Sequence, residues 1–332
     1  MNQPVRPRVQ LPGISSRAWE HPADRGALVA LRKLRGFDTI LKALSGLVNE
    51  RTVRLSLLGS AVKVDERQFT RLHWLLGDVG AALDVAELPE LFVLADPQLN
   101  AVTIGMNRPM IVLNSGLVDL LDDEELRFVI GHEVGHALSG HAVYQTILLR
   151  LLALSGALGA IPLGGLGTRV IVAALFEWSR KAELSADRAA LLACQDPQVA
   201  LRVHMKVASG GHLEDLDPPS FLAQASEYEA AGDVRDMLLR LQLVENASHP
   251  FAVVRAKELR RWVDSGEYAR ILAGNYPRRE DDAHAPLSEA AQEAAASYAE
   301  SFSSIGDTLG RFLQDVVGVI GGVKGWLEEK LR

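Results

Sequence analysis

The feature that most constrains the fold of this chain is a run of five residues, His-Glu-Val-Gly-His, at positions 132–136. On an α-helix, residues four apart lie on one face, so the imidazoles of His132 and His136 can bind one metal ion. Glu133 then lies beside the open coordination position, where a carboxylate can take a proton from a zinc-activated water. The motif therefore predicts a helix and favours a zinc-dependent hydrolase, specifically a peptidase.

The residues around the motif are those expected of a helix. A capping residue and an acidic first turn precede it at positions 122–125, which is typical of a helix N-terminus. Apolar residues follow at helical spacing: Leu126, Val129, Ile130, Val134 and Ala137. Gly135 is a poor helix former that costs up to about 1 kcal/mol. It either lets another backbone pack closely or makes room beside the metal.

A catalytic zinc usually has three protein ligands, so a third one must be found. His141 is close in sequence, but at 100° per residue it points roughly away from His132. We interpret it as a histidine that packs against or supports a ligand. The better candidate is Glu183, which would complete a set of two histidines and one glutamate.

Glu183 lies in a strongly helical segment with Asp187 one turn later and Arg180 one turn earlier. Asp187 could accept the free ring N–H of a ligating histidine and so fix its tautomer. An exposed stripe of alternating charge would look the same, because such stripes are common on helices. The preceding motif favours the metal interpretation.

A third constellation is Ser-His-Pro at 248–250, with Arg255 six residues after the histidine. A donor is needed opposite the zinc to hold the oxyanion that forms when water adds to a peptide carbonyl. His249 and Arg255 are candidates for that donor. A histidine before a proline is more often a residue at a helix start.

Taken together, these residues resemble the HtpX and CAAX-prenyl-protease family of gluzincin metallopeptidases. The resemblance covers roughly residues 85–262. It rests on the motifs at 132–136, 183–187 and 248–250 with Arg255, and on the upstream Asn100-Ala101-Val102. Family members usually have phenylalanine at the position of Val102.

The resemblance implies one Zn²⁺ ion and a role for each matching residue. The metal ligands would be His132, His136 and Glu183, with Glu133 as general base, Asp187 behind the ligands, and His249 and Arg255 near the substrate carbonyl. The spacing of Arg180, one turn before Glu183, places it behind the ligands as well. The strand of Asn100, Ala101 and Val102 would be the edge against which a peptide lies as an added strand.

The fold class that follows is α+β and mainly helical, a gluzincin-type core with a small β-sheet beside the active-site helix. Short apolar runs predict strands at 91–94, 101–104 and 110–113, and Asn107-Arg108-Pro109 fits a turn between the last two.

The pattern of the chain predicts four regions. Residues 1–84 form a tail and a helical region, in which 1–20 look disordered or loosely attached and 27–47 and 64–83 carry apolar residues. Residues 85–265 form the peptidase domain, 266–300 a linker and 301–332 an amphipathic helix. That helix would pack on its own domain, bind a partner helix or lie on a membrane surface.

Composition excludes some functions. A net charge of −7 argues against nucleic-acid binding, which needs a concentrated basic face. The single Cys194 excludes an internal disulfide framework, and we interpret it as a packed apolar residue. No secretory signal is visible, so a cytoplasmic location is the default.

The segment 147–176 is strongly apolar and has no charge between 151 and 168. One crossing of a bilayer would start the two metal helices on opposite sides, and two crossings would need roughly 40 apolar residues. We therefore expect a hairpin that is buried or dips into a membrane, rather than a two-span anchor. In the case of a dip, the protein would contact the membrane from its cytoplasmic side.

The sequence thus predicts a zinc metalloendopeptidase that acts on extended or unfolded polypeptide. Two alternatives remain open: a zinc-stabilised peptide-binding or chaperone-like module without turnover, against which Glu133 argues, and a membrane-associated scaffold. The oligomeric state is not readable from the sequence.

Overall fold

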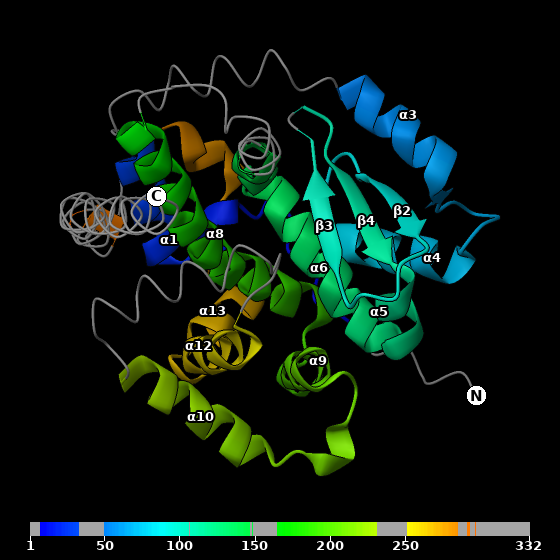
Figure 1. Ribbon diagram of the computed structural model, residues 1–332. Helices are drawn as coiled ribbons and strands as arrows, with labels where there is room; N and C mark the ends of the chain where they lie inside the picture. The colour runs from blue at the N-terminus through cyan, green and yellow to red at the C-terminus, as the bar shows by residue number, and fades with distance from the viewer. Residues whose placement is uncertain are drawn as a thin grey trace, which may run out of the picture.

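The computed structural model describes residues 7–32, 50–105, 107–146, 148, 165–230, 251–284, 291–292 and 296. This part of the chain is mainly helical, with one small four-stranded sheet to one side of the two longest helices (Figure 1). The predicted α+β, mainly helical class is confirmed.

The sheet contains β1 (Val62–Lys63), β2 (Glu90–Leu94), β3 (Ala101–Ile104) and β4 (Met110–Asn114), in the order β1-β2-β4-β3. Strands β2 and β4 are parallel, whereas β1 with β2 and β3 with β4 are antiparallel. The three predicted strands are confirmed to within one residue at each end. Strand β1 was not predicted, because two residues carry no readable alternation. In the described residues β3 lies at an edge of the sheet, beside helix α6 (Figure 1).

The described helices include a central pair, α6 and α8, which pack along each other and are surrounded by others. They are η1 (Ser16–Ala18), α1 (Pro22–Arg32), α3 (Glu50–Ser60), α4 (Thr70–Ala82), α5 (Ser115–Leu120), α6 (Asp123–Leu138), α8 (Gly165–Cys194), α9 (Pro197–Ser209), η3 (Leu213–Asp215), α10 (Pro218–Ala230), α12 (Ala252–Asp264), α13 (Glu267–Leu272) and η4 (Arg279–His284). Helix α6 lies between the sheet and α8, and α4, α9, α1 and α12 pack around this pair.

Helix α6 begins as its sequence predicts. The carboxylate of Asp122 accepts the backbone N–H of Glu125 at 2.9 Å, and the Glu125 carboxylate accepts that of Asp122 at 2.9 Å. This reciprocal capping box fixes the first turn. Every residue from Glu125 to His136 is buried, so the polar side chains of the motif need partners inside the protein.

The expectation that residues 1–20 are loosely attached is wrong for the described part of that segment. Leu11, Ile14 and Trp19 are at most 1% exposed and belong to the same core as α4, α6 and α8. Full burial of such side chains stabilises the fold by about 1.5–3 kcal/mol each. The prediction failed because Pro12 follows Leu11 and the segment has neither helical nor strand periodicity.

The expected linker at 266–300 is also wrong over its first part. Helix α13 places Tyr268 and Ile271 in the common core, and Arg278 pairs with Ile14 in an isolated β-bridge. The other expected boundary lies after residue 84. Before it, β1 belongs to the same sheet as β2, β3 and β4, and Leu72 of α4 belongs to the common core. Residue 84 therefore does not divide two separate cores.

Two expectations fall largely outside the described residues. Most of the apolar hairpin expected at 147–176 and all of the helix expected at 301–332 lie there. Within the described parts, no helix combines the length and apolar character needed to cross a membrane.

Candidate metal centre

The close approach of α6 and α8 depends on small residues along their contact. A Cβ atom on Gly135 would lie 2.6 Å from Cβ of Ala189, and one on Gly131 would lie 2.7 Å from Cβ of Ala193. Real Cβ atoms do not approach so closely, so only glycine permits this separation. Of the two interpretations of Gly135, close backbone packing is the one that the structure shows. This packing brings Glu183 of α8 over the histidines of α6.

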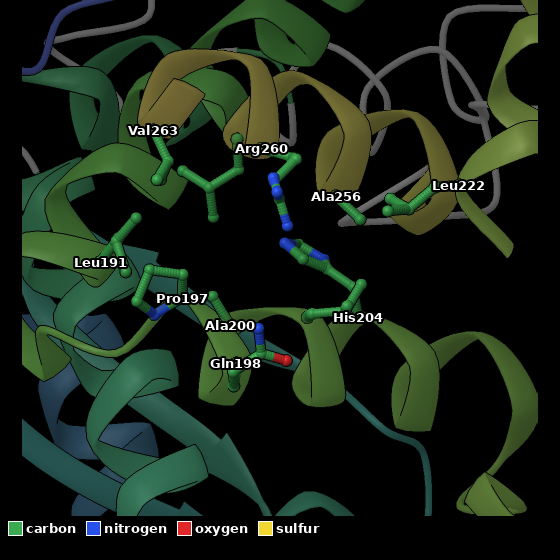
Figure 2. Close-up of a pocket in the computed structure, with 11 residues that line it drawn as sticks. Leu191, Pro197, Gln198, Ala200, His204, Leu222, Ala256, Arg260 and Val263 are labelled. Carbon is green, nitrogen blue, oxygen red and sulfur yellow. The ribbon is translucent and has the colours of Figure 1, made fainter. Parts of the chain in front are cut away.

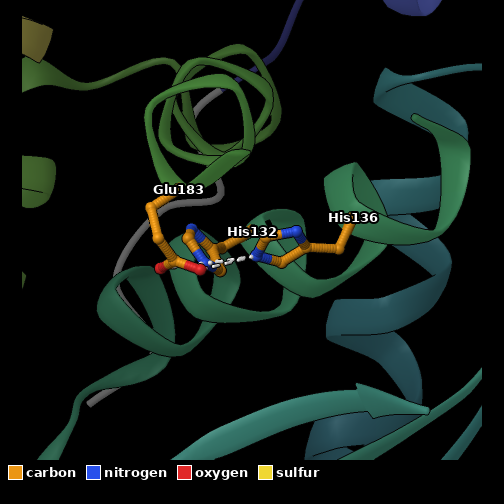
Figure 3. Close-up of side chains that lie close together, drawn as sticks. All are labelled: His132, His136 and Glu183. Carbon is orange, nitrogen blue, oxygen red and sulfur yellow. Dashed lines mark hydrogen bonds and ion pairs between the residues drawn. The ribbon is translucent and has the colours of Figure 1, made fainter. Parts of the chain in front are cut away.

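The two histidines and the glutamate converge on one point (Figure 3). The Nε2 atoms of His132 and His136 are 3.1 Å apart. Glu183 places Oε2 3.4 Å from Nε2 of His132 and Oε1 3.2 Å from Nε2 of His136. All three side chains are buried.

These three residues fit a tetrahedral zinc ion. With Zn–N and Zn–O bonds of about 2.0–2.1 Å, neighbouring ligand atoms of a tetrahedron lie about 3.3–3.4 Å apart. The observed separations of 3.1–3.4 Å, in which Glu183 contributes a different oxygen toward each histidine, are close to these edges. Two imidazole nitrogens and one carboxylate also form a known ligand set of catalytic zinc.

A buried ion-pair cluster lies behind His132. Oδ1 of Asp187 is 3.0 Å from Nδ1 of His132, and Oδ2 of Asp187 accepts from Nε of Arg255 at 2.7 Å. Nη1 of Arg255 is 3.0 Å from Oε2 of Glu183. Arg255 therefore faces the two carboxylates that surround His132. It holds the carboxylate beside one candidate ligand, His132, and contacts another candidate ligand, Glu183, directly.

The electrostatics of the cluster follow from these contacts. Burial alone would raise the pKa of Asp187, but the Arg255 guanidinium holds it well below its usual range. Burial lowers the pKa of His132, yet hydrogen bonds to Asp187 and Glu183 outweigh this and raise it to about 9. Burial lowers the pKa of His136 to about 4. His136 is thus neutral, the form that can offer a lone pair to a metal.

Glu133 is fully buried and hydrogen-bonded to the edge strand. The Thr103 hydroxyl lies 2.6 Å from Oε2 of Glu133 and 3.0 Å from its backbone oxygen. Side chains alternate along β3, so that Ala101 and Thr103 are buried while Val102 is only partly covered. Thr103 was not singled out in the sequence. A polar residue at an inward position of this strand is the signal that could have identified it.

The other predicted residues lie as follows. Arg180 places its guanidinium over the ring of Phe251, 5.1 Å from the centroid. The backbone oxygen of Asn100 accepts from the Asn114 N–H at 3.0 Å, which continues the β3–β4 ladder. His249 falls outside the described residues.

A further buried histidine, His204, was not identified from the sequence. His204 of α9 places Nε2 3.6 Å from Oδ2 of Asp187, and burial lowers its pKa to about 4. It also lines a mostly apolar pocket and reaches toward Arg260 of α12 (Figure 2). None of the three metal-site residues lines this pocket, so it is separate from the metal centre.

A mainly helical domain with two histidines and a glutamate on two packed helices is the architecture of gluzincin metallopeptidases. The sequence model of Peptidase family M48 matches residues 66–263, more than half of the chain. The chain belongs to this family, among its HtpX-like members.

Curated relatives agree with this assignment. The chain is 36% identical over 259 residues to the plastoglobule-localized metallopeptidase 48, chloroplastic, of Arabidopsis thaliana, covering 76% of this chain and 74% of the relative. It is 32% identical to a protease HtpX homolog of Streptococcus pneumoniae and 29% identical to protease HtpX of Xanthomonas axonopodis pv. citri. These two matches span 39% and 40% of this chain and less than half of each relative, 41% and 45%. No solved structure matches the chain significantly.

Replacing Gly135 by alanine is expected to separate α6 from α8 and weaken metal binding. The added methyl would meet Ala189 at 2.6 Å, and overpacking of this kind costs about 1–3 kcal/mol. Gly77 of α4 is the matched control, because a Cβ there meets nothing within 4 Å and Gly77→Ala should gain up to about 1 kcal/mol. Urea unfolding and zinc retention during dialysis measure both effects. Equal behaviour of the two variants would show that the contact tolerates a larger residue.

Proposed function

We propose that the chain is a zinc-dependent endopeptidase that hydrolyses peptide bonds in extended or unfolded polypeptide. The observation that carries this proposal is the convergence of two imidazoles and a carboxylate to within 3.1–3.4 Å of one another. Glu133, the next residue after His132, adds a buried carboxylate on the same helix. A structural metal site would have no need of it.

In this proposal each residue has a separate task. His132, His136 and Glu183 hold the ion, and bound zinc supplies a Lewis acid that polarises a carbonyl and makes water more acidic. Glu133 takes a proton from the attacking water and passes it to the leaving amine. The Thr103 hydroxyl keeps the Glu133 carboxylate oriented. Asp187 keeps the ring of His132 oriented.

We assign Arg255 to positioning rather than to the substrate carbonyl. Its donors face Asp187 and Glu183, so the guanidinium is occupied by carboxylates of the site itself. His249 stays our candidate for the group that stabilises the oxyanion, because the site still needs a donor opposite the metal.

The substrate would lie along β3. This strand is at a sheet edge in the described residues and contacts α6, and its Thr103 touches Glu133. A peptide added as a further strand would be bound mainly through its backbone. We therefore propose that Asn100, Ala101 and Val102 align an extended chain with its scissile bond near Glu133.

Metal removal tests the proposal. The purified protein should contain one zinc per chain and cleave a permanently unfolded protein such as reduced, alkylated casein. A chelator should abolish cleavage, and added Zn²⁺ should restore it. Glu183→Ala should retain far less zinc, since it removes one of three ligands. Cleavage that persists in metal-free protein would refute the function, and zinc binding without cleavage would favour a peptide-binding module.

A further inference from the structure

We propose that Asp24, in the N-terminal segment, is a positioning residue that fixes the metal-binding tautomer of His136 through His141. The inference rests on the proposed metal site and extends it. His132 has a carboxylate directly behind it, in Asp187. His136 has a second histidine behind it, and the carboxylate lies one step further away.

The contacts form a continuous buried chain. Nδ1 of His136 is 3.0 Å from Nδ1 of His141. Nε2 of His141 is 2.9 Å from Oδ2 of Asp24. The three residues are at most 2% exposed, so water does not replace these contacts.

The direction of the hydrogen bonds follows from the chemistry of the groups. The ionised carboxylate of Asp24 can only accept, so Nε2 of His141 must carry a hydrogen. With its single ring hydrogen on Nε2, His141 has no hydrogen on Nδ1, which then accepts a hydrogen from Nδ1 of His136. His136 is thereby left with a bare Nε2, the atom that faces His132 and Glu183. Each step favours the tautomer that a metal ligand needs.

Two further donors hold Asp24 in this role. Nε1 of Trp178 donates to Oδ1 of Asp24 at 2.9 Å, and the Ser185 hydroxyl donates to Oδ2 at 2.6 Å. Burial raises the pKa of Asp24, but His141 and these donors outweigh it and lower that pKa. The indole N–H of Trp178 can only donate a hydrogen bond. The atom that faces it, Oδ1 of Asp24, must therefore be an acceptor.

A neighbouring amide does not provide the same control. Nε2 of Gln145 lies 3.4 Å from Nδ1 of His136. A side-chain amide can turn over and offer either its oxygen or its nitrogen. The Asp24 carboxylate, unlike this amide, selects one tautomer. Asp24 also precedes the region 66–263 that matches the family, so the site depends on a residue outside that region.

Asp24→Asn tests the inference because asparagine keeps the shape of the side chain but replaces one acceptor oxygen by an NH₂ group, which donates. Trp178 requires the amide oxygen on its side, so the NH₂ group must face His141. His141 would then carry its hydrogen on Nδ1 and face the N–H of His136. Loss of such supporting partners typically weakens metal binding about 10–100-fold. We expect that loss in the zinc dissociation constant, measured by competition with a chromogenic chelator on folded full-length protein.

The double variant Asp24→Asn with Trp178→Phe is the sharper test. Phenylalanine removes the indole N–H, so the amide can turn its oxygen toward His141 and restore the tautomer. The double variant should bind zinc more tightly than Asp24→Asn alone, although Trp178→Phe leaves a cavity in the core. A purely structural role predicts the opposite order, because the two losses would add. A double variant that binds no more tightly than Asp24→Asn would overturn the inference.

A second pair of variants applies if Asp24→Asn does not fold. In His141→Gln the side-chain NH₂ group must donate to Asp24. The amide oxygen then faces His136 and can accept the hydrogen of its Nδ1, as His141 does in the wild type. His141→Leu has no polar atom. We expect His141→Gln to bind zinc at least tenfold more tightly than His141→Leu, and equal affinities would overturn the inference. Wild-type protein that binds no zinc would instead refute the proposed function.

Discussion

Glu133→Gln is expected to abolish peptide hydrolysis while zinc stays bound. Glutamine keeps the size of the side chain and can still accept from Thr103, which now lies 2.6 Å from the carboxylate. It cannot take a proton from water at neutral pH. General base catalysis contributes about 10²–10⁴-fold, so cleavage of an unfolded protein should fall by at least two orders of magnitude.

Glu124→Gln is the matched control for this variant. Glu124 is on the same helix, its side chain is 34% exposed, and it pairs with Arg8 and Arg127. Its loss should change the rate per folded molecule little, because Glu124 lies about two helical turns before His132 and its partners, Arg8 and Arg127, are not candidate metal ligands. Zinc content should be equal in wild type and both variants. Glu133→Gln protein that retains zinc and more than a tenth of the wild-type rate would exclude Glu133 as the base.

Arg255→Met is expected to destabilise the fold and weaken zinc binding together. Arg255 is the cation that contacts both Asp187 and Glu183, and its side chain is 9% exposed. Removing one partner from a buried ion pair costs about 3–5 kcal/mol, because the other charge is left behind. Asp187 would then gain a proton or turn away, and either change weakens its hydrogen bond to His132.

Arg260→Met on the same helix separates this effect from a general loss of charge. Arg260 pairs with Asp264, and both side chains are more than half exposed, 55% and 57%. We expect its urea midpoint and zinc affinity to stay near those of wild type, since such pairs are weak. Arg255→Lys should fall between the two, because lysine keeps the charge but loses the planar fork. If Arg255→Met were as stable as Arg260→Met, the ion-pair cluster would have no structural role.

The sequence predicts those parts of the site that lie on one regular element. The spacing of His132 and His136 fixes their direction once the helix is known, and Asp122 with Glu125 identifies where that helix begins. The strands next to it were readable because short apolar runs end at a turn. In each of these cases the regular geometry of a helix or strand determines, from the spacing of residues in the sequence, which way their side chains point.

The rest of the site depends on contacts between distant segments. Asp24 belongs to an unremarkable acidic position in the sequence, and its partner His141 follows more than one hundred residues later. Nothing in either local pattern links them. Arg255 was recognised, but its partners were not, because an arginine can face a substrate or a buried carboxylate equally well. Leu11 and Trp19 enter the core from a segment without periodicity.

The glycine and alanine contact between α6 and α8 also bears on which ion the candidate site would accept. The candidate ligand groups approach one another to 3.1–3.4 Å, which suits bonds of about 2.0–2.1 Å. Calcium forms bonds of 2.3–2.6 Å and prefers six to eight oxygen ligands, so it would force the two helices apart. We therefore expect the tight packing of α6 against α8 to disfavour larger cations, because the spacing of the two helices keeps the candidate ligand atoms close together.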